Sequence, residues 1–161
     1  MKIKEGEKLP DSNVFVLNNN SPEQVSINQL IGKDKIIIFG IPGAFTPTCS
    51  AKHLPSFINS METIKNKNVK KVICISVNDP FVMEAWGKSS NATGKIIMVG
   101  DSKGEFTKNI GAEVDLGTRG LNIRSVRYAM LVEAGLVKKL AEEEVAGKCE
   151  ITAAENFLKK I

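Results

Sequence analysis

The chain has 161 residues, 42% of them hydrophobic and 25% charged, and its formal net charge is +4. This composition excludes a disordered or fibrous chain, and the length suits one domain, so we expect a single domain over residues 1–161. The positive charge is mild. No aromatic residues lie between the clustered lysines, which favours a solvated face over a nucleic-acid site for Lys65, Lys67, Lys70 and Lys71.

The sequence carries no sign of export, membrane insertion or metal binding. No apolar run is long enough to span a bilayer, and the first residues lack the apolar core of a secretory signal, so we expect a cytoplasmic location and no membrane partner. Three widely spaced cysteines, Cys49, Cys74 and Cys149, fit thiols that are kept reduced rather than a disulfide framework. With His53 as the single histidine and no paired cysteines, we expect no metal site and no bound cofactor.

Strand and helix patterns alternate from the start of the chain. Residues 14–17 predict a short strand, residues 18–22 the turn after it, and residues 26–31 a single helical turn that Gly32 ends. Residues 35–39 are apolar and β-branched without alternation, which is typical of a central strand covered on both faces.

Longer elements follow in the middle of the chain. Apolar residues recur at three- and four-residue spacing over residues 50–64, which predicts a helix with one buried face that Pro55 kinks or restarts. Residues 72–77 and 95–99 predict two further strands. Between these strands, Pro80 suits the first position of a second helix.

The last third of the chain changes character. A short helix is predicted over residues 106–110, and the glycine-bearing residues 114–122 predict a loop. Residues 127–132 and 136–140 predict a hairpin with a tight turn between its strands, and residues 142–144 predict an exposed loop.

A final helix is predicted near the C-terminus, because Thr152-Ala153-Ala154-Glu155 matches a capping box. The predicted order is strand–helix three times, then a hairpin and a helix. This order predicts an α/β domain with a mixed central β-sheet flanked by α-helices, the antiparallel part of the sheet coming last.

The segment between the strand at residues 35–39 and the helix after it carries the chemistry. Residues 42–49 read PGAFTPTC and place Cys49 at or near a helix N-terminus. The unpaired N–H groups and the helix dipole there favour a thiolate, the reactive form of cysteine. The Thr46 hydroxyl lies three residues earlier and can either orient a substrate beside the sulfur or cap the helix. Cys74, in the middle of a predicted strand, fits a buried core thiol.

Residues 42–50, PGAFTPTCS, resemble the active-site motif of the peroxiredoxins, Pro-x-x-x-Thr-x-x-Cys, and HLP at residues 53–55 is similar to the peroxiredoxin-5 or type II branch. The resemblance continues through residues 76–86 and 124–129, so it covers essentially the whole chain. It implies a thioredoxin-like fold. It also implies a thiol-dependent peroxidase of antioxidant defence, which reduces hydrogen peroxide and alkyl hydroperoxides through a cysteine sulfenic acid.

The same resemblance implies a role for four residues. Cys49 is the attacking thiolate, Thr46 orients the peroxide, and Pro42 shields the sulfur from water. Peroxide cleavage also needs a positive group to hold the departing oxygen, and by resemblance this is the guanidinium of Arg127.

Two further arginines lie close in sequence to Arg127. Arg119 is expected to be solvated in a loop, residues 117–120, that borders the pocket, and an open pocket there favours alkyl hydroperoxides. Arg124 is expected to support Arg127 from behind it.

The thiol that regenerates the enzyme stays open between three routes. Cys149 lies near the position where the animal-type branch carries a resolving cysteine. The residues flanking it suggest exposure, and thioredoxin is then the expected reductant. Cys74 occupies the position assigned this role in plant-type relatives, and glutathione with glutaredoxin is the external route. Relatives often form dimers through the faces near Phe45 and Phe81, so we expect a homodimer or a monomer.

Two other functions compete with peroxide reduction. His53 follows Cys49 by four residues, so a Cys–His hydrolase is conceivable, although no Asp or Asn is evidently placed to orient the imidazole. A solvated or hydrogen-bonded surface histidine fits the position better. A redox-regulated binding module that uses the same fold is the other alternative.

Overall fold

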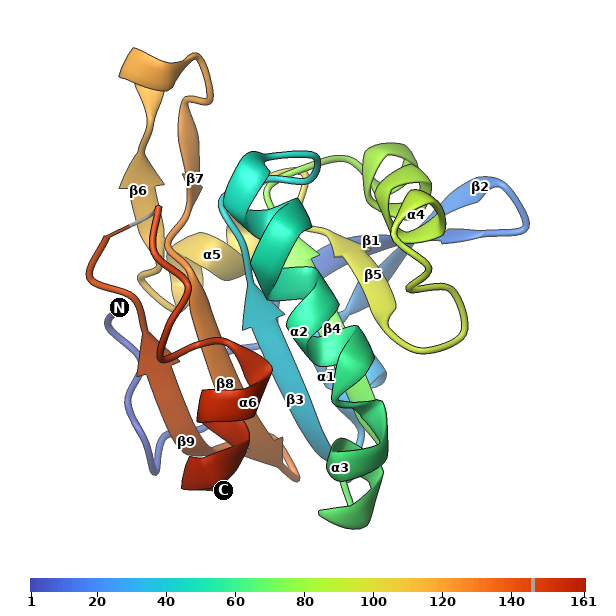
Figure 1. Ribbon diagram of the computed structural model, residues 1–161. Helices are drawn as coiled ribbons and strands as arrows, with labels where there is room; N and C mark the ends of the chain where they lie inside the picture. The colour runs from blue at the N-terminus through green and yellow to red at the C-terminus, as the bar shows by residue number, and fades with distance from the viewer. Residues whose placement is uncertain (146) are drawn as a thin grey trace.

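A seven-stranded mixed sheet forms the centre of the computed structural model, which describes residues 1–145 and 147–161 (Figure 1). The order of strands across the sheet is β2-β1-β5-β4-β3-β8-β9. The pairs β3–β4 and β4–β5 are parallel and the other pairs are antiparallel. The predicted mixed central sheet is therefore confirmed. The strands span β1 (Asn13–Asn18), β2 (Ser21–Ser26), β3 (Lys35–Gly40), β4 (Lys71–Ser76), β5 (Ile97–Gly100), β8 (Tyr128–Glu133) and β9 (Leu136–Glu142).

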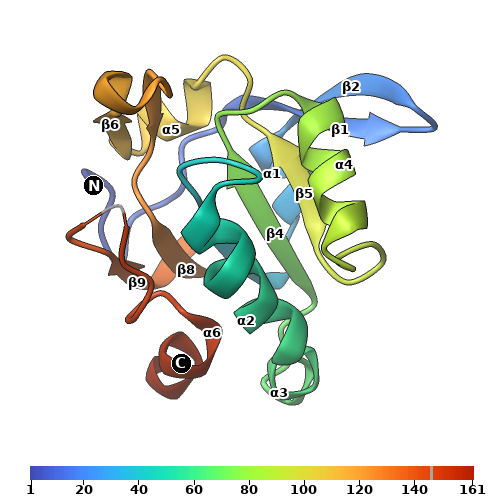
Figure 2. The same ribbon diagram turned by 45° about the horizontal axis from the view of Figure 1, so that its top comes forward.

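Helices cover both faces of this sheet (Figures 1 and 2). One buried cluster joins the sheet to α2, α3, α4 and α6, and a second cluster on the opposite face joins it to α1 and α5. The helical elements are α1 (Ile27–Ile31), η1 (Cys49–His53), α2 (Leu54–Asn59), α3 (Met61–Asn66), α4 (Pro80–Ser89), α5 (Glu105–Asn109), α6 (Ala154–Phe157) and η3 (Leu158–Lys160).

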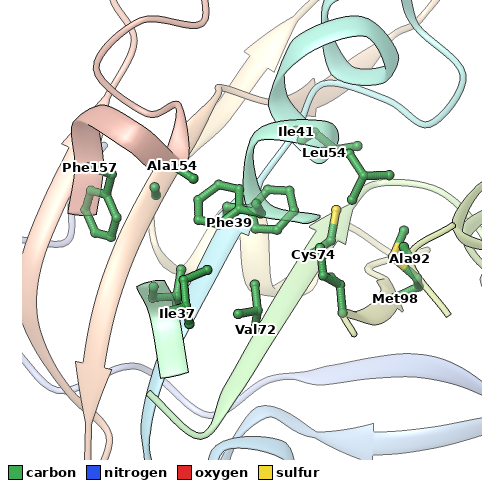
Figure 3. Close-up of a cluster of buried hydrophobic side chains, with 14 of the residues drawn as sticks. Ile37, Phe39, Ile41, Leu54, Val72, Cys74, Ala92, Met98, Ala154 and Phe157 are labelled. Carbon is green, nitrogen blue, oxygen red and sulfur yellow. The ribbon is translucent and has the colours of Figure 1, made fainter. Parts of the chain in front are cut away.

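The central strand β3 is apolar throughout because each of its faces meets one of these clusters. Ile37 and Phe39 point to the face that α2 and α6 cover, where Figure 3 shows Phe39 near Cys74 of the neighbouring strand. Ile36 and Ile38 alternate with them and point to the face of α1 and α5. Apolar and polar residues do not alternate along this strand because both of its faces are buried, as predicted.

The first hairpin corrects the turn predicted over residues 18–22. The turn occupies Asn19 and Asn20, whose φ angles are +47° and +62°, and the chain then pairs back on β1 as strand β2. The sequence of β2, SPEQVS, is polar because the strand forms an edge of the sheet and most of its side chains are exposed. Pro22 is tolerated at such an edge.

A two-stranded arm replaces the loop predicted over residues 114–122. Strands β6 (Glu113–Asp115) and β7 (Ile123–Ser125) pair antiparallel, and the short 3₁₀ helix η2 (Gly117–Arg119) closes the tip of the arm. The Asp115 Oδ1 accepts a hydrogen bond from the Gly117 N–H at 2.8 Å, which fixes the start of that turn. The arm projects from the body of the molecule (Figure 1).

The C-terminal segment corrects two further predictions. The capping box over residues 152–155 is absent: Ala153 is the N-cap of α6, and the Thr152 hydroxyl instead donates to the Glu143 Oε1 at 3.0 Å. The loop predicted to be exposed over residues 142–144 is exposed only at Glu144. Glu142 ends β9 and pairs with the N-terminal ammonium at 2.6 Å, and Glu143 is buried.

Candidate active site

The segment that follows β3 places Cys49 in the first turn of a helix. Pro47 and Thr48 already have helical backbone, and Cys49 opens one turn of π-helix in which the Leu54 N–H bonds to the Cys49 carbonyl. The next residue, Pro55, has no N–H to donate to the preceding turn, so the regular helical pattern restarts as α2. The predicted helix start and the predicted restart at the proline are both confirmed.

Sheet topology brings Arg127 to this cysteine. Strands β3 and β8 are antiparallel neighbours, and Gly40 at the end of β3 pairs with Tyr128 at the start of β8. Cys49 follows the first strand and Arg127 immediately precedes the second, so both lie at the same edge of the sheet. Cys49 is fully buried, Arg127 is 1% exposed, and the Arg127 Nη1 donates to the Cys49 Sγ at 3.3 Å. The guanidinium therefore brings a permanent positive charge into direct contact with the sulfur.

The predicted Thr46 and Pro42 line a cavity beside this pair. The Thr46 hydroxyl donates to the Gly43 carbonyl at 2.7 Å rather than capping the helix, so its oxygen remains an acceptor toward the cavity. The cavity has a volume of about 220 Å³ and is lined by Pro42, Thr46, Pro47, Thr48, Leu116, Arg119, Leu121, Arg127 and Gly147.

Arg124 and Arg119 occupy different places around this cavity. The Arg124 Nε donates to the Leu121 carbonyl at 2.8 Å and its Nη1 to the Pro42 carbonyl at 3.4 Å. This side chain therefore links the backbone of two residues that line the cavity. Arg119, near the tip of the arm, is exposed, as predicted, and it lines the cavity.

His53 is the site residue that sequence reasoning placed wrongly. It is fully buried instead of lying on the surface, with its Nδ1 at 3.2 Å from the Arg127 Nη1 and its Nε2 at 3.1 Å from the Thr152 carbonyl. A guanidinium only donates and a carbonyl only accepts, so the ring is neutral with its proton on Nε2. Burial, together with the positive charge of Arg127, lowers the pKa of His53 to about 3. Its acceptor nitrogen faces Arg127, so it is not placed as a base for a Cys–His hydrolase.

Cys149 also differs from expectation, because it is 9% exposed rather than free at the surface. Its segment is held by Glu143, whose Oε1 accepts from the backbone N–H groups of Glu150 at 2.6 Å and Thr152 at 3.0 Å. Burial raises the pKa of Glu143, but these hydrogen bonds outweigh it and leave the pKa below its usual value. Burial raises the pKa of the Cys149 thiol, which makes it a poor nucleophile in this conformation.

Cys74 is fully buried in β4, as predicted, and burial raises its pKa well above the usual value. It belongs to the same buried cluster as Cys49 and points among apolar side chains in Figure 3. All three cysteines are free thiols.

Two hydrogen bonds from α4 and the turn before it hold the cysteine-bearing segment in place. The Trp86 Nε1 donates to the Ser50 Oγ at 3.0 Å, directly after Cys49 in sequence. The Asn78 Oδ1 accepts from the Ala44 N–H at 3.0 Å. Trp86 and Asn78 lie within residues 76–86. The sequence pointed to that segment only through its resemblance to a known family.

The described residues contain no cluster of three or more His, Cys, Asp or Glu side chains that could hold a metal ion. Within residues 1–145 and 147–161, no helix is both long and apolar enough to cross a membrane.

Comparisons with known proteins agree with this geometry. Residues 4–158 match the Redoxin family. The chain is 42% identical over 157 residues to Peroxiredoxin-2D of Arabidopsis thaliana, covering 97% of this chain and 96% of the relative. Reduced Prx3 of Vibrio vulnificus in complex with H2O2 superimposes with a TM-score of 0.92 at 37% identity, covering 98% of both chains. Peroxiredoxin 5 of Alvinella pompejana superimposes with a TM-score of 0.86 at 32% identity, covering 98% of this chain and 96% of that one.

These four matches cover almost the full chain, two of them by sequence and two by the superposition of solved structures. The predicted thioredoxin-like architecture and the predicted resemblance to the type II and peroxiredoxin-5 branch are thereby confirmed. The chain belongs to the peroxiredoxin family of thiol-dependent peroxidases.

Proposed function

We propose that this protein reduces hydroperoxides with Cys49 as the peroxidatic nucleophile and with Thr46, Arg127 and Pro42 as the residues that serve it. One observation carries the assignment of roles: the Arg127 Nη1 lies 3.3 Å from the Cys49 Sγ in a buried setting. The low dielectric of such a setting strengthens the attraction between the guanidinium and a thiolate.

The reaction follows from the contacts of these four residues. The thiolate sulfur of Cys49 attacks the terminal peroxide oxygen, so the S–O bond forms as the O–O bond breaks. The electron pair of that bond leaves on the other oxygen, which takes up a proton and departs as an alcohol or as water. Arg127 stabilises the departing oxygen, and the Thr46 oxygen accepts the O–H of the incoming peroxide. Pro42 shields the sulfur from bulk water.

A single-turnover experiment tests this proposal. One equivalent of hydrogen peroxide should oxidise Cys49 directly, in the wild type and in Cys74→Ser, far faster than it oxidises free cysteine, and Cys49→Ser should lose the reaction. A Cys49 that reacts no faster than free cysteine would refute the peroxidase and favour the binding module. Turnover of an activated ester without peroxide would point to the hydrolase.

For the regeneration step, we propose that Cys149 resolves the Cys49 sulfenic acid and that thioredoxin reduces the resulting disulfide. In support, a second cavity is lined by Cys149 together with Ala51 and Lys52 of the same helical turn as Cys49. Cys74 lies in the middle of a sheet strand, so a link from it would require that strand to deform. Movement of Cys149 requires only that the segment held by Glu143 opens.

Mass mapping under non-reducing conditions, after one equivalent of peroxide, distinguishes the routes. A Cys49–Cys149 link is expected. A Cys49–Cys74 link, or a Cys49 sulfenic acid with no internal link, would overturn this assignment. The second outcome would favour glutathione with glutaredoxin as the reductant.

For assembly and location, we propose a homodimer in the cytoplasm, with the monomer as the alternative state. Phe45 and Phe81 are 58% and 54% exposed, and the hydrogen bond from the Ala44 N–H to Asn78 ties together the two segments that carry them. Sedimentation of the wild type and of Phe81→Asp tests the dimer. A charged side chain in place of Phe81 should prevent a second copy from packing against these rings, so the variant should sediment as a monomer. The free thiols suit a reducing compartment, which cell fractionation tests.

A further inference from the structure

The cavity beside Cys49 contains two positive side chains in very different surroundings. Arg127 is buried at the sulfur, whereas Arg119 is exposed on the arm. The wall of the cavity is largely apolar, and its lining residues include Leu116 and Leu121 of the arm and Pro42. None of the residues that line the cavity is acidic.

The arm holds Arg119 in position and leaves its guanidinium available. The Arg119 N–H donates to the Leu116 carbonyl at 2.9 Å, so the backbone that carries the side chain is fixed. The acidic residue nearest in sequence, Asp115, uses its Oδ1 to accept from the Gly117 N–H. In the described part of the chain, the Arg119 side chain takes part in no salt bridge. Arg124, by contrast, is engaged with two carbonyl groups.

We propose that Arg119 forms an anion subsite which selects organic hydroperoxides that carry a carboxylate. This inference rests on the proposed function, because the peroxide group of the same molecule must reach Cys49. The carboxylate binds Arg119 at the exposed end of the cavity, and the apolar body of the substrate lies against Leu116 and Leu121. Hydrogen peroxide carries no carboxylate and gains nothing from this subsite.

The size of the cavity limits the substrate further. Its volume of about 220 Å³ is smaller than the roughly 300–1,000 Å³ of pockets that enclose drug-sized ligands. The substrate body is therefore compact, such as a single ring or a short branched chain. The product is the corresponding hydroxy-carboxylate: one peroxide oxygen passes to the Cys49 sulfur as a sulfenic acid, and the other remains on the substrate as an alcohol.

A matched pair of hydroperoxides tests the subsite. The probes are 4-(2-hydroperoxypropan-2-yl)benzoate, which is anionic, and its methyl ester, which has the same apolar body without the charge. Stopped-flow measurement gives the second-order rate constant for Cys49 oxidation by each probe and by hydrogen peroxide. The variants are Arg119→Gln, Arg119→Lys, and Lys138→Gln, which removes one exposed positive charge on β9 away from the cavity.

The acid should react faster than the ester with the wild type. Arg119→Gln should lower the acid-to-ester ratio by about two- to fivefold, as expected for one partly solvated ion pair, and added salt should reduce the wild-type ratio. Arg119→Lys should retain part of the preference. Lys138→Gln should leave both this ratio and the rate with hydrogen peroxide unchanged.

Equal rates for acid and ester with the wild type would overturn the subsite. So would an unchanged ratio in Arg119→Gln, or an equal loss in Lys138→Gln. In each of these outcomes the protein still reacts rapidly with hydrogen peroxide, so only the anion subsite fails. If none of the three peroxides oxidises Cys49 rapidly, the peroxidase proposal and the subsite fail together.

Discussion

At the scale of single residues, one nitrogen of Arg127 serves two neighbours. Its Nη1 lies 3.3 Å from the Cys49 Sγ and 3.2 Å from the His53 Nδ1, and it carries two hydrogens that can point to the two acceptors. The neutral ring of His53 therefore helps to fix the orientation of the guanidinium without adding a charge beside the sulfur.

Replacement of Arg127 by glutamine removes the positive charge next to the thiolate and next to the departing oxygen. The rate constant for oxidation of Cys49 by hydrogen peroxide should fall about 100- to 1,000-fold, the usual effect of losing one preorganised donor to a developing charge. Stopped-flow oxidation of the variant checks this. Arg127→Lys should recover part of the rate, and a rate within threefold of wild type in Arg127→Gln would contradict the role of the guanidinium.

His53 should make the fold sensitive to mild acid. Its pKa is about 3 in the fold and about 6.5 when unfolded, so below pH 6.5 the unfolded chain binds a proton that the folded chain refuses. The free energy of unfolding is therefore highest above pH 6.5. It falls as the pH is lowered, by up to about 1.4 kcal/mol per pH unit.

Urea unfolding between pH 7 and pH 5 checks this slope. The matched variant His53→Asn lacks the titrating ring and should show a nearly flat free energy of unfolding over the same interval. Equal slopes for the two proteins would show that His53 is not the cause.

At the scale of elements, Glu143 controls the segment that carries Cys149. Its Oε1 accepts from Glu150 and from both the N–H and the hydroxyl of Thr152, while its own N–H donates to the Arg127 carbonyl. Glu143 thus joins the segment before α6, through its carboxylate, to the residue before β8, through its backbone N–H.

Glu143→Ala should loosen this segment and expose its thiol. In a Cys49→Ser/Cys74→Ser background, alkylation of Cys149 should become about tenfold faster, since hydrogen bonds to a charged group contribute about 1.5–3 kcal/mol. Mass spectrometry of the alkylated protein gives the rate. The exposed neighbour provides the control, because Glu144→Ala should react like the parent. An unchanged rate in Glu143→Ala would mean that other contacts hold the segment.

The elements also show what the sequence could and could not predict. Strands β3 and β4 were predictable because burial on both faces demands continuous apolar residues. Strand β2 was missed because an edge strand needs no apolar face, and the β6–β7 arm because its seven-residue connection contains two glycines and few apolar residues.

The same limit applies within the site. Cys49 and Thr46 lie in one local motif, and that motif identified them. Nothing local to His53 indicated that residues about a hundred positions later would cover it, and its partner Thr152 was instead assigned to a helix cap. Contacts between distant segments decide such burial, and a helical pattern does not contain them.

At the scale of the whole molecule, the antiparallel pairing of β3 and β8 builds the site. Gly40 is the last residue of β3, and a Cβ added there would overlap the ring of Tyr128, the residue after Arg127. The position of the Tyr128 ring against β3 therefore depends on glycine.

Gly40→Ala should lower the free energy of unfolding by about 3 kcal/mol, at the upper end of the usual cost of overpacking, and should slow peroxide reduction by displacing Arg127. Urea unfolding and the single-turnover rate measure the two effects. Gly147→Ala is the matched control for stability, since a Cβ there would meet no atom within 4 Å. A fully stable Gly40→Ala protein would mean that the Tyr128 ring can move aside without cost.

The hydrogen bond between Trp86 and Ser50 has a practical consequence. The chain contains one tryptophan, its indole is buried, and its N–H touches the residue adjacent to Cys49. Tryptophan fluorescence therefore originates from a single site, at the turn that carries the proposed peroxidatic sulfur. Rearrangement of that turn during the catalytic cycle can be followed in real time by emission alone, without a label or a coupled reductase.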